Sequence, residues 1–229
     1  MTRPTGPKVT SAATASLRPL PRSFYRRSTE EVARDLLGRY LVRHLDGDRL
    51  VLRLVETEAY LGAPDRASHA WNGRRTERNE SLYLSGGHAY VYLIYGIHCC
   101  LNAVTGEADV GSAVLLRAGE PVAGAETLRR QREWQDRKVR PGDLAGGPGK
   151  LCQALAIDRA FDGVPLGPFD GSDDPAGLLI AEGEPVSEAE IVAGPRVGVD
   201  YAGEAAAWPL RFAVRGNRHV SRPRVDRRA

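Results

Sequence analysis

Cysteine is scarce in this sequence: the 229 residues include three, Cys99, Cys100 and Cys152. Adjacent cysteines rarely bond to each other and an odd number suits reduced thiols, so we expect no disulfide framework. The CxxC spacing that is typical of a zinc site is also absent. A metalloenzyme that uses His98, Cys99 and Cys152 stays as an alternative, but we expect neither a metal nor a cofactor.

Long apolar segments are missing as well. No run approaches the roughly 18–20 residues of a membrane-spanning helix, and residues 1–20 lack the continuous apolar core of a secretory signal. This N-terminal stretch is rich in Pro, Thr, Ser and Ala, which is typical of a disordered tail. We therefore expect a cytoplasmic protein without membrane contact, and the lack of targeting signals suits a bacterial origin.

Lysine is rare among the basic residues. Of 32 basic residues three are lysines, so arginine is the general cation and no single arginine stands out. The net charge is only +3, but residues 158–204 contain eleven acidic residues and two arginines, whereas residues 205–229 contain seven arginines and one aspartate. Such asymmetry indicates either an anionic partner, with nucleic acid first, or a solvated arginine surface.

Length and composition predict a single globular domain, because the chain is 42% hydrophobic and 27% charged. A capping box at residues 28–31 (STEE) predicts a helix that ends near Gly38, and residues 46–47 (DG) predict a hairpin turn between strands at 40–42 and 50–55. Helices and hairpins mix without βαβ alternation, so the expected fold class is α+β. Further strands are expected at 89–95, 97–104, 113–117, 189–199 and 210–215, and further helices at 123–138 and 151–155.

The segment GGPGKL at 146–151 looks like a phosphate loop at first. The Walker A pattern requires glycine where Leu144 stands and Ser or Thr where Leu151 stands, which argues against an NTPase. A glycine-rich loop before a helix can still bind a phosphate through backbone N–H groups, with Lys150 assisting. The segment therefore indicates either a contact to a DNA phosphate or a simple helix start.

Polar residues on apolar strands are candidates for chemistry. Glu56 and Glu58 lie on one face of a strand, where they can act as an acid and a base, or where one is structural and the other catalytic. His69 follows in a polar loop. Asn102, on an apolar strand, needs hydrogen-bond partners or faces a ligand. Arg117, at the end of another strand, needs a carboxylate or a phosphate.

Three tyrosines fall within six positions of a chain that is only 7% aromatic. Tyr90 and Tyr92 share one face of a strand because side chains alternate with period two, whereas Tyr95 points to the other face, just before a glycine. Together with Tyr60 and His69, Tyr92 can line a pocket for a flat base, and Tyr95 at a hairpin tip can enter a duplex. The alternative is that these are ordinary residues of a sheet.

Several segments also form one ordered set over about residues 20–221. They are VETEAYLG (55–62), RNESLYLSGGHAYVYLIYG (78–96), AVLLRAGEP (113–121), GPGKLCQALAI (147–157), RVGVDYAGEAAAWPLRF (196–212) and VRGN (214–217). Together with His69 and Asn102, this set resembles the alkyladenine (3-methyladenine) DNA glycosylase family. The resemblance implies a single compact α+β domain at 21–221, built around a curved antiparallel sheet with a protruding β-hairpin. A disordered tail at 1–20 and a basic tail at 222–229 would flank this domain.

The resemblance implies a role for each matching residue. Glu58 is expected to be the general base that activates a water, and Arg117 and the carbonyl of Val197 are expected to hold that water. The expected base-pocket residues are Tyr60, Ala67, His69, Tyr92 and Asn102; those in the DNA groove are the intercalating Tyr95 with Ile97 and His98; those near the DNA backbone are Arg74, Arg75, Arg78 and Lys150.

The implied function is that of a monofunctional DNA glycosylase in base-excision repair. Such an enzyme flips alkylated or deaminated purines out of duplex DNA and hydrolyses the N-glycosidic bond, which leaves an abasic site. A bifunctional lyase would need an amine nucleophile, and none of Lys8, Lys138 and Lys150 suits that role. We expect a monomer that acts at the nucleoid on duplex DNA containing damaged purines. The alternative is a module that binds damaged DNA without catalysis.

Overall fold

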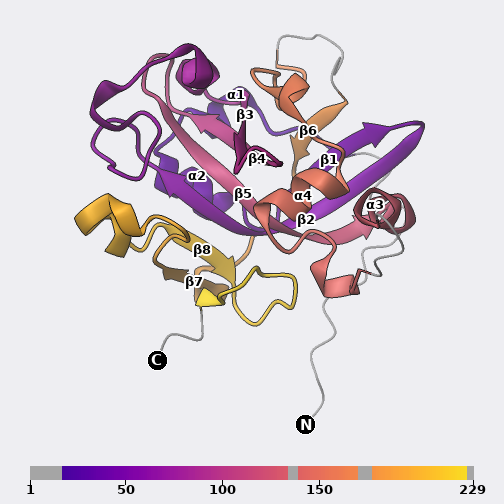
Figure 1. Cartoon of the computed structure of the whole chain (residues 1–229). Helices are drawn as coiled ribbons and strands as arrows, with labels where there is room; N and C mark the ends of the chain where they lie inside the picture. Colours follow the sequence, from indigo (N-terminus) through magenta and orange to yellow (C-terminus); the bar gives the residue numbers. More distant parts are fainter. Residues whose placement is uncertain (1–16, 134–138, 170–176, 226–229) are drawn as a thin grey trace.

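The computed structural model describes residues 17–133, 139–169 and 177–225, and its centre is an eight-stranded open sheet (Figure 1). The strand order is β3-β4-β5-β2-β1-β6, and β8 pairs with β2 and with β7. All of these pairs are antiparallel, so the predicted α+β fold class is confirmed. The strands are β1 (Tyr40–Leu45), β2 (Asp48–Tyr60), β3 (Ala89–Ile94), β4 (His98–Thr105), β5 (Ser112–Ala123), β6 (Leu178–Ala181), β7 (Ile191–Gly194) and β8 (Arg211–Val214).

Short helices surround the sheet. The α-helices are α1 (Arg22–Tyr25), α2 (Thr29–Asp35), α3 (Ala125–Arg132) and α4 (Pro148–Ala154). The 3₁₀ segments are η2 (Trp71–Gly73), η3 (Glu77–Tyr83), η4 (Pro141–Asp143), η5 (Arg159–Phe161), η6 (Glu188–Glu190) and η7 (Asp200–Ala207). Within the described residues, none of the helices has the length and apolar character needed to cross a bilayer.

The local signals at the N-terminal side of the sheet are confirmed. Ser28 caps α2: its hydroxyl accepts a hydrogen bond from the N–H of Glu31, whose carboxylate accepts one from the N–H of Ser28. The helix ends at Asp35, three residues before the expected limit. Asp46 and Gly47 form the predicted hairpin turn between β1 and β2, and both have positive φ (50° and 84°), as such two-residue turns require.

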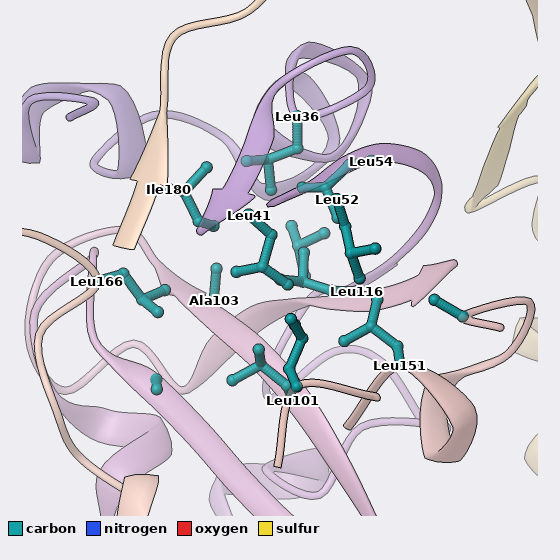
Figure 2. Packing of buried hydrophobic residues seen from close by; sticks show 14 of the residues in the cluster. Leu36, Leu41, Leu52, Leu54, Leu101, Ala103, Leu116, Leu151, Leu166 and Ile180 are labelled. Atoms are coloured by element: carbon teal, nitrogen blue, oxygen red, sulfur yellow. The ribbon is translucent and has the colours of Figure 1, made fainter. Parts of the chain in front are cut away.

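The main core lies where helices α2 and α4 pack on the central strands. Leu52 and Leu54 of β2, Leu101 of β4 and Leu116 of β5 meet side chains from both helical regions, such as Leu151 of α4 (Figure 2). Each fully buried leucine of this kind contributes about 1.5–3 kcal/mol to the free energy of folding. The core therefore fixes β2 and β5 firmly, and these two strands carry Glu56, Glu58 and Arg117.

A double irregularity in the β2–β5 pairing decides which side chains point away from this core. The register shifts on both sides of Glu56, next to Arg117 on β5. Before the register shift, the even-numbered residues Leu52 and Leu54 belong to the core. After the shift, the odd-numbered Ala59 belongs to it instead. An extra residue in a strand turns the following side chains to the other face. Glu56 and Glu58 are thereby kept out of the apolar core that regular alternation from Leu52 would give them.

Several expected limits need correction. The acidic region 158–190 contains strand β6, which pairs with β1 and was not predicted. The strand expected at 113–117 extends to Ala123, and the helix expected at 123–138 spans Ala125–Arg132, with residues 134–138 outside the described part. Leu20 is buried and donates its N–H to Ile180, and Val225 packs against the sheet. Packed residues thus lie just outside both limits of 21–221, and the domain limits stay a prediction because residues 1–16 and 226–229 lie outside the description.

Candidate active site

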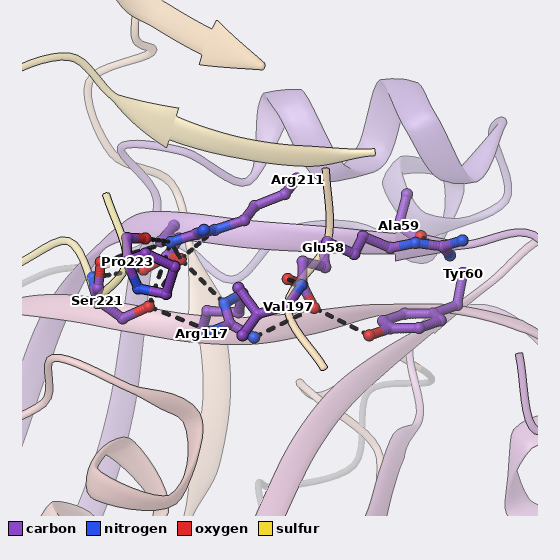
Figure 3. Close-up of polar contacts among 10 residues, drawn as sticks. Glu58, Ala59, Tyr60, Arg117, Val197, Arg211, Ser221 and Pro223 are labelled. Carbon is purple, nitrogen blue, oxygen red and sulfur yellow. Dashed lines mark hydrogen bonds and ion pairs between the residues drawn. The ribbon is translucent and has the colours of Figure 1, made fainter. Parts of the chain in front are cut away.

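Glu58 lies near the end of β2 and its side chain is fully buried. Its Oε1 accepts a hydrogen bond from the main-chain N–H of Val197 at 2.8 Å, and its Oε2 accepts one from the hydroxyl of Tyr60 at 2.9 Å. The Nη1 of Arg117 lies 3.2 Å from the same Oε2 (Figure 3). Three donors from three different segments therefore hold this carboxylate in one orientation.

The donors to Glu58 also line a cavity of about 500 Å³, a size that suits a small-molecule ligand or a single base. Strands β3, β4 and β5 and the loops after β2 and β7 supply the other walls. Among the lining residues are Tyr60, Ala67, Ser68, His69, Tyr90, Tyr92, Tyr95, Asn102, Leu115, Arg117, Pro148, Val197 and Tyr201. All five residues predicted for a base pocket thus surround one cavity, together with Arg117 and Val197.

His69 forms an aromatic corner of the cavity. Its Nδ1 lies 2.7 Å from the hydroxyl of Tyr90, and its ring centre lies 4.6 Å from that of Tyr92 at an interplanar angle of 70°. Burial, with smaller effects from Arg78 and Arg74, lowers the pKa of His69 below its ordinary value. The imidazole is therefore neutral at neutral pH, so this wall does not repel a cationic ligand.

Two tyrosines of the cavity keep their protons for the same reason. Burial, followed by the nearby charge of Glu58, raises the pKa of Tyr60 well above its ordinary value. Burial and the neighbouring Cys100 likewise raise the pKa of Tyr92. Tyr60 therefore remains a hydrogen-bond donor to Glu58, and both rings present neutral aromatic faces.

Asn102 and Ala67 are held by the main chain around the cavity. The Asn102 side chain is buried on β4 and its Nδ2 donates to the carbonyl of Tyr90 at 3.0 Å, which answers its need for a partner while it also lines the cavity. The N–H of Ala67 donates to Asp65, and its carbonyl accepts a hydrogen bond from the Tyr201 hydroxyl. Both residues are thus fixed before any ligand arrives.

The hairpin of β3 and β4 exposes two large apolar side chains at its tip. Tyr95 is 86% exposed and Ile97 is 73% exposed. Tyr95 and Gly96 form the turn with φ of 53° and 72°, close to the values at the Asp46-Gly47 turn. Tyrosine is a poor residue for a left-handed conformation, whereas aspartate is a good one. Turn geometry therefore does not explain the tyrosine, and an exposed aromatic at a tip points to a binding role.

Arginines lie beside the 500 Å³ cavity, which we call the base cavity after its predicted ligand. Arg66, Arg74 and Arg78 border a second hollow of about 450 Å³ that shares His69 with the first cavity. Within the described part of the chain, no carboxylate pairs with these three arginines. The hollow therefore presents positive charge to whatever lies next to the base cavity.

The other predicted backbone contacts are already engaged. Arg75 forms ion pairs with Glu80 and Asp109, each at 2.5 Å, and lines neither cavity. Lys150 pairs with Asp143 at 2.7 Å. Both pairs are at the surface, where such interactions are weak, so a DNA contact by either cation stays a prediction.

His98 and the glycine-rich segment pack against each other. A Cβ placed on Gly149 would come within 3.2 Å of the Cβ of His98, so glycine allows the first turn of α4 to approach the hairpin. Helix α4 begins directly after this loop, at Pro148. The expected helix start is present, but it belongs to both interpretations of the segment, so a phosphate contact stays a prediction.

The metal-binding alternative finds no support in the described residues. No group of three His, Cys, Asp or Glu side chains among them is arranged to hold a metal ion, and this includes His98, Cys99 and Cys152. Burial instead raises the pKa of the Cys152 thiol well above its ordinary value. This thiol is therefore a small apolar group of the core.

Sequence reasoning missed the polar residues that support the site. Asp65 and Arg196 form a completely buried ion pair between the loop after β2 and the segment that carries Val197. Asn79 is buried and its Nδ2 donates to the carbonyls of His69 and Arg74, which fixes the loop of the aromatic corner. These residues lie far apart in sequence or in polar loops, so periodicity gives no signal for them.

The candidate site thus combines a buried carboxylate, an aromatic cavity lined by its three donors, a hollow bordered by arginines and an exposed tyrosine at a hairpin tip. The chain belongs to the methylpurine-DNA glycosylase (MPG) family, whose model matches residues 23–218. This agrees with the family resemblance seen in the sequence.

Individual relatives are similar over nearly their whole length. A protein of Methanocella arvoryzae is 48% identical over 203 residues, which cover 89% of this chain and 96% of the relative. One of Bdellovibrio bacteriovorus is 46% identical and one of Clostridium botulinum is 42% identical, each covering 89% of this chain and 98% of the relative. Each is named "Putative 3-methyladenine DNA glycosylase".

Proposed function

We propose that this protein is a monofunctional DNA glycosylase that removes alkylated or deaminated purines from duplex DNA. The observation that carries the proposal is the arrangement at Glu58, a buried carboxylate whose three donors line a cavity large enough for a purine. Family membership and the names of the relatives support this class of reaction. The proposed substrates are 3-methyladenine, 7-methylguanine, hypoxanthine and ethenoadenine.

The proposed reaction is hydrolysis of the bond between C1′ of the sugar and the purine nitrogen. The electron pair of that bond leaves with the base, and positive charge develops on the sugar, as in glycoside hydrolysis. Glu58 stabilises this charge and accepts a proton from a water whose oxygen bonds to C1′. Arg117 and the carbonyl of Val197 hold the water. The scheme needs no metal or cofactor.

The aromatic walls serve recognition in this scheme. Tyr60, His69 and Tyr92 stack on the flipped base, and each such contact contributes about 1–3 kcal/mol to binding. Cationic lesions gain further from the neutral aromatic faces through cation–π attraction. The main chain at Ala67 contacts the purine edge, and Asn102 disfavours the exocyclic amino group of normal guanine.

The exposed hairpin and the cations serve DNA binding. Tyr95 enters the space that the flipped nucleotide leaves, and Ile97 and His98 face the minor groove. The proposed backbone contacts are Arg74, Arg75, Arg78 and Lys150. We take the protein to act as a monomer on duplex DNA.

The described residues place no lysine at the base cavity, which favours simple hydrolysis over a lyase step. A lyase forms a covalent imine between an amine and the sugar. Lys150 is the single lysine in residues 17–133, 139–169 and 177–225, and it pairs with Asp143 rather than lining the base cavity. The product is therefore an abasic site in an uncut strand.

Single-turnover excision tests the proposal. Duplexes with one central hypoxanthine or ethenoadenine, and separately methylated DNA, are incubated with excess protein, and free base and alkali-sensitive breaks are measured. Glu58→Gln should lose on the order of 100- to 10,000-fold in rate, because an amide cannot accept the water's proton. Glu30→Gln makes the same chemical change on the exposed face of α2 and is the matched control.

Each outcome has a clear meaning. Release by the wild type and by Glu30→Gln, with little release by Glu58→Gln at unchanged DNA binding, supports the proposal. Normal turnover by Glu58→Gln would falsify its role as the base. No release from any substrate by a wild type that still binds damaged duplexes turns the argument toward a non-catalytic damage-binding module.

A further inference from the structure

Each nitrogen of the Arg117 guanidinium has a different partner. Nε donates to Oε1 of Glu56 at 2.9 Å, Nη2 donates to the hydroxyl of Ser221 at 3.2 Å, and Nη1 lies 3.2 Å from Oε2 of Glu58. The Arg117 side chain is only 6% exposed. The guanidinium is thus a planar link between the two carboxylates of β2, and its orientation is set on both sides.

Glu56 is the far end of this link and is itself saturated with donors. Its Oε1 accepts hydrogen bonds from Arg117, from Nε of Arg211 at 2.7 Å and from the hydroxyl of Ser221 at 2.9 Å. Its Oε2 accepts one from the N–H of Ser221 at 2.7 Å. Glu56 is fully buried, and of its donors only Arg117 lines the base cavity, whereas all three donors to Glu58 line it. Glu56 is therefore one step further from the cavity than Glu58 and is linked to it through Arg117.

We infer that Glu56 is a positioning residue, which with Arg211 and Ser221 fixes the Arg117 guanidinium and so sets the orientation and charge balance of Glu58. This inference rests on the proposed function, because it assigns a task within that reaction. It also resolves the two alternatives for the pair of carboxylates: Glu58 acts on the substrate, and Glu56 supports it.

Electrostatics agrees with this division. Burial alone would raise the pKa of Glu56, but Arg117 and Arg211 outweigh it and lower the pKa below its ordinary value. The cluster therefore contains two carboxylates and two guanidiniums, which balance. The other titratable or charged side chains whose charges act on Glu58, or on which its charge acts, are Tyr60, Tyr92, Cys100 and Arg196. The tyrosines and the cysteine are neutral at neutral pH, so Glu56 is the second negative charge of the cluster.

The rest of the cluster comes from the C-terminal part of the fold. Arg211 is on β8, which pairs with β2 beside both glutamates. Its Nη2 also donates to the carbonyl of Pro223 at 2.7 Å, just beyond Ser221. Segment 217–225 is therefore bound to the back of the site and is more than a covering loop.

Two variants that each remove one charge separate positioning from general stability. Glu56→Gln keeps the shape but removes the charge, and it should lower the single-turnover excision rate by roughly 10- to 100-fold, as loss of a supporting partner typically does. Binding of a damaged duplex should stay within about threefold. Because the cluster then contains one negative charge fewer, the acidic limb of the rate–pH profile should move to lower pH. Arg211→Gln removes a positive charge and should move this limb to higher pH.

Ser221→Ala covers the case in which Glu56→Gln fails to fold. It removes the hydroxyl that bonds both Glu56 and Arg117 without changing the charge, so the excision rate should fall at least threefold and the acidic limb should stay in place. Thr57→Val is the matched control, because Thr57 lies between the two glutamates but bonds the carbonyl of Ala33 on the opposite face. It should lower the melting temperature and keep the excision rate.

The outcomes distinguish this inference from the proposed function. If the wild type excises bases and folded Glu56→Gln has the same rate and the same rate–pH profile, the inference alone is overturned. If Glu56→Gln does not fold, a wild-type excision rate in Ser221→Ala overturns it instead. A rate loss in Thr57→Val as large as in Glu56→Gln also overturns it, because stability would then explain both. No excision by the wild type overturns the proposed function and the inference together.

Discussion

The guanidinium of Arg196 lies 4.7 Å from the centre of the Tyr60 ring and forms a buried ion pair with Asp65. Its Nη1 also donates to the carbonyl of Ala59 at 2.9 Å. Arg196 directly precedes Val197, and Asp65 accepts the N–H of Ala67. One buried pair thus joins a wall of the base cavity to the segment whose N–H holds Glu58.

Breaking this pair should strongly destabilise the fold. Arg196→Met leaves Asp65 buried without its counter-charge, and we expect the free energy of unfolding to fall by about 3–5 kcal/mol, measured by urea denaturation. The double variant Asp65→Asn with Arg196→Met should recover part of this loss. Glu30→Gln breaks the exposed pair with Arg34 and should change stability by less than about 1 kcal/mol. If Arg196→Met and Glu30→Gln lowered the free energy of unfolding equally, burial of the Asp65–Arg196 pair would not be the cause of the loss.

Replacing Tyr95 by asparagine should keep or raise the stability of the protein and weaken its binding to the flipped state of DNA. Asparagine tolerates the left-handed conformation better than tyrosine does, so Tyr95→Asn should leave the melting temperature unchanged or raise it. The same variant should weaken capture of the flipped base, measured by ethenoadenine fluorescence in a duplex. Asp46→Asn makes a comparable change in the Asp46-Gly47 turn and should leave flipping unchanged. An unaltered flipping equilibrium in Tyr95→Asn removes the wedge from the scheme.

The pKa of His69 should depend on the neighbouring arginines. Because burial and then Arg78 and Arg74 lower the pKa of His69 in the folded protein, the unfolded chain binds that proton more readily. The contribution of His69 to stability is therefore complete above the unfolded pKa of roughly 6.5, and it is lost as the pH falls toward the lower folded pKa. We expect Arg78→Gln to raise the pKa of His69, measured by NMR titration of the ring. Arg129→Gln on α3 should not, and an identical titration in all three proteins contradicts the proposed cause.

Two adjacent arginines should differ in the salt dependence of DNA binding. Arg74 borders the basic hollow without a carboxylate partner in the described residues, whereas Arg75 pairs with Glu80 and Asp109. Each phosphate contact makes the negative slope of log K against log salt steeper by about 0.9. Arg74→Gln should therefore make the slope shallower by about 0.9, and Arg75→Gln should change it less, because Arg75 contacts a phosphate only when it leaves Glu80 or Asp109. The reverse result would place the DNA backbone on the Arg75 side.

Local signals in the sequence predicted much of the fold. The capping box at Ser28 and the turns at Asp46 and Tyr95 depend on neighbours in sequence, so they appear where they were expected. Strand β6 was missed because its four residues, Leu178–Ala181, acquire their strand form only by pairing with β1, in a region that is otherwise acidic and rich in glycine. Its existence depends on contacts that no local pattern records.

The candidate site, like the fold, was predicted only in part from the sequence. The five residues that the family resemblance predicts for a base pocket lie around one cavity, and their role stays a prediction. The residues behind it do not follow from the sequence, because Arg211 looks like one more surface arginine until β8 places it beside Glu56. Regular alternation from Leu52 would also have put Glu56 and Glu58 into the core, and the double irregularity that prevents this has no signature in the sequence. The positions of Arg211, Glu56 and Glu58 therefore depend on long-range strand pairing and on a backbone irregularity, which the local sequence does not predict.

The contact between Glu56 and Ser221 spans 165 residues, and this has a consequence during translation. Glu56 leaves the ribosome early, but its hydroxyl and amide donors from Ser221 follow only when almost all of the described domain has been made. Until then β2 carries two acidic side chains whose supporting cluster is incomplete, and Glu58 has no fixed Arg117. In the proposed scheme a nascent or prematurely ended chain that lacks Ser221 therefore excises bases more slowly than the full-length protein does.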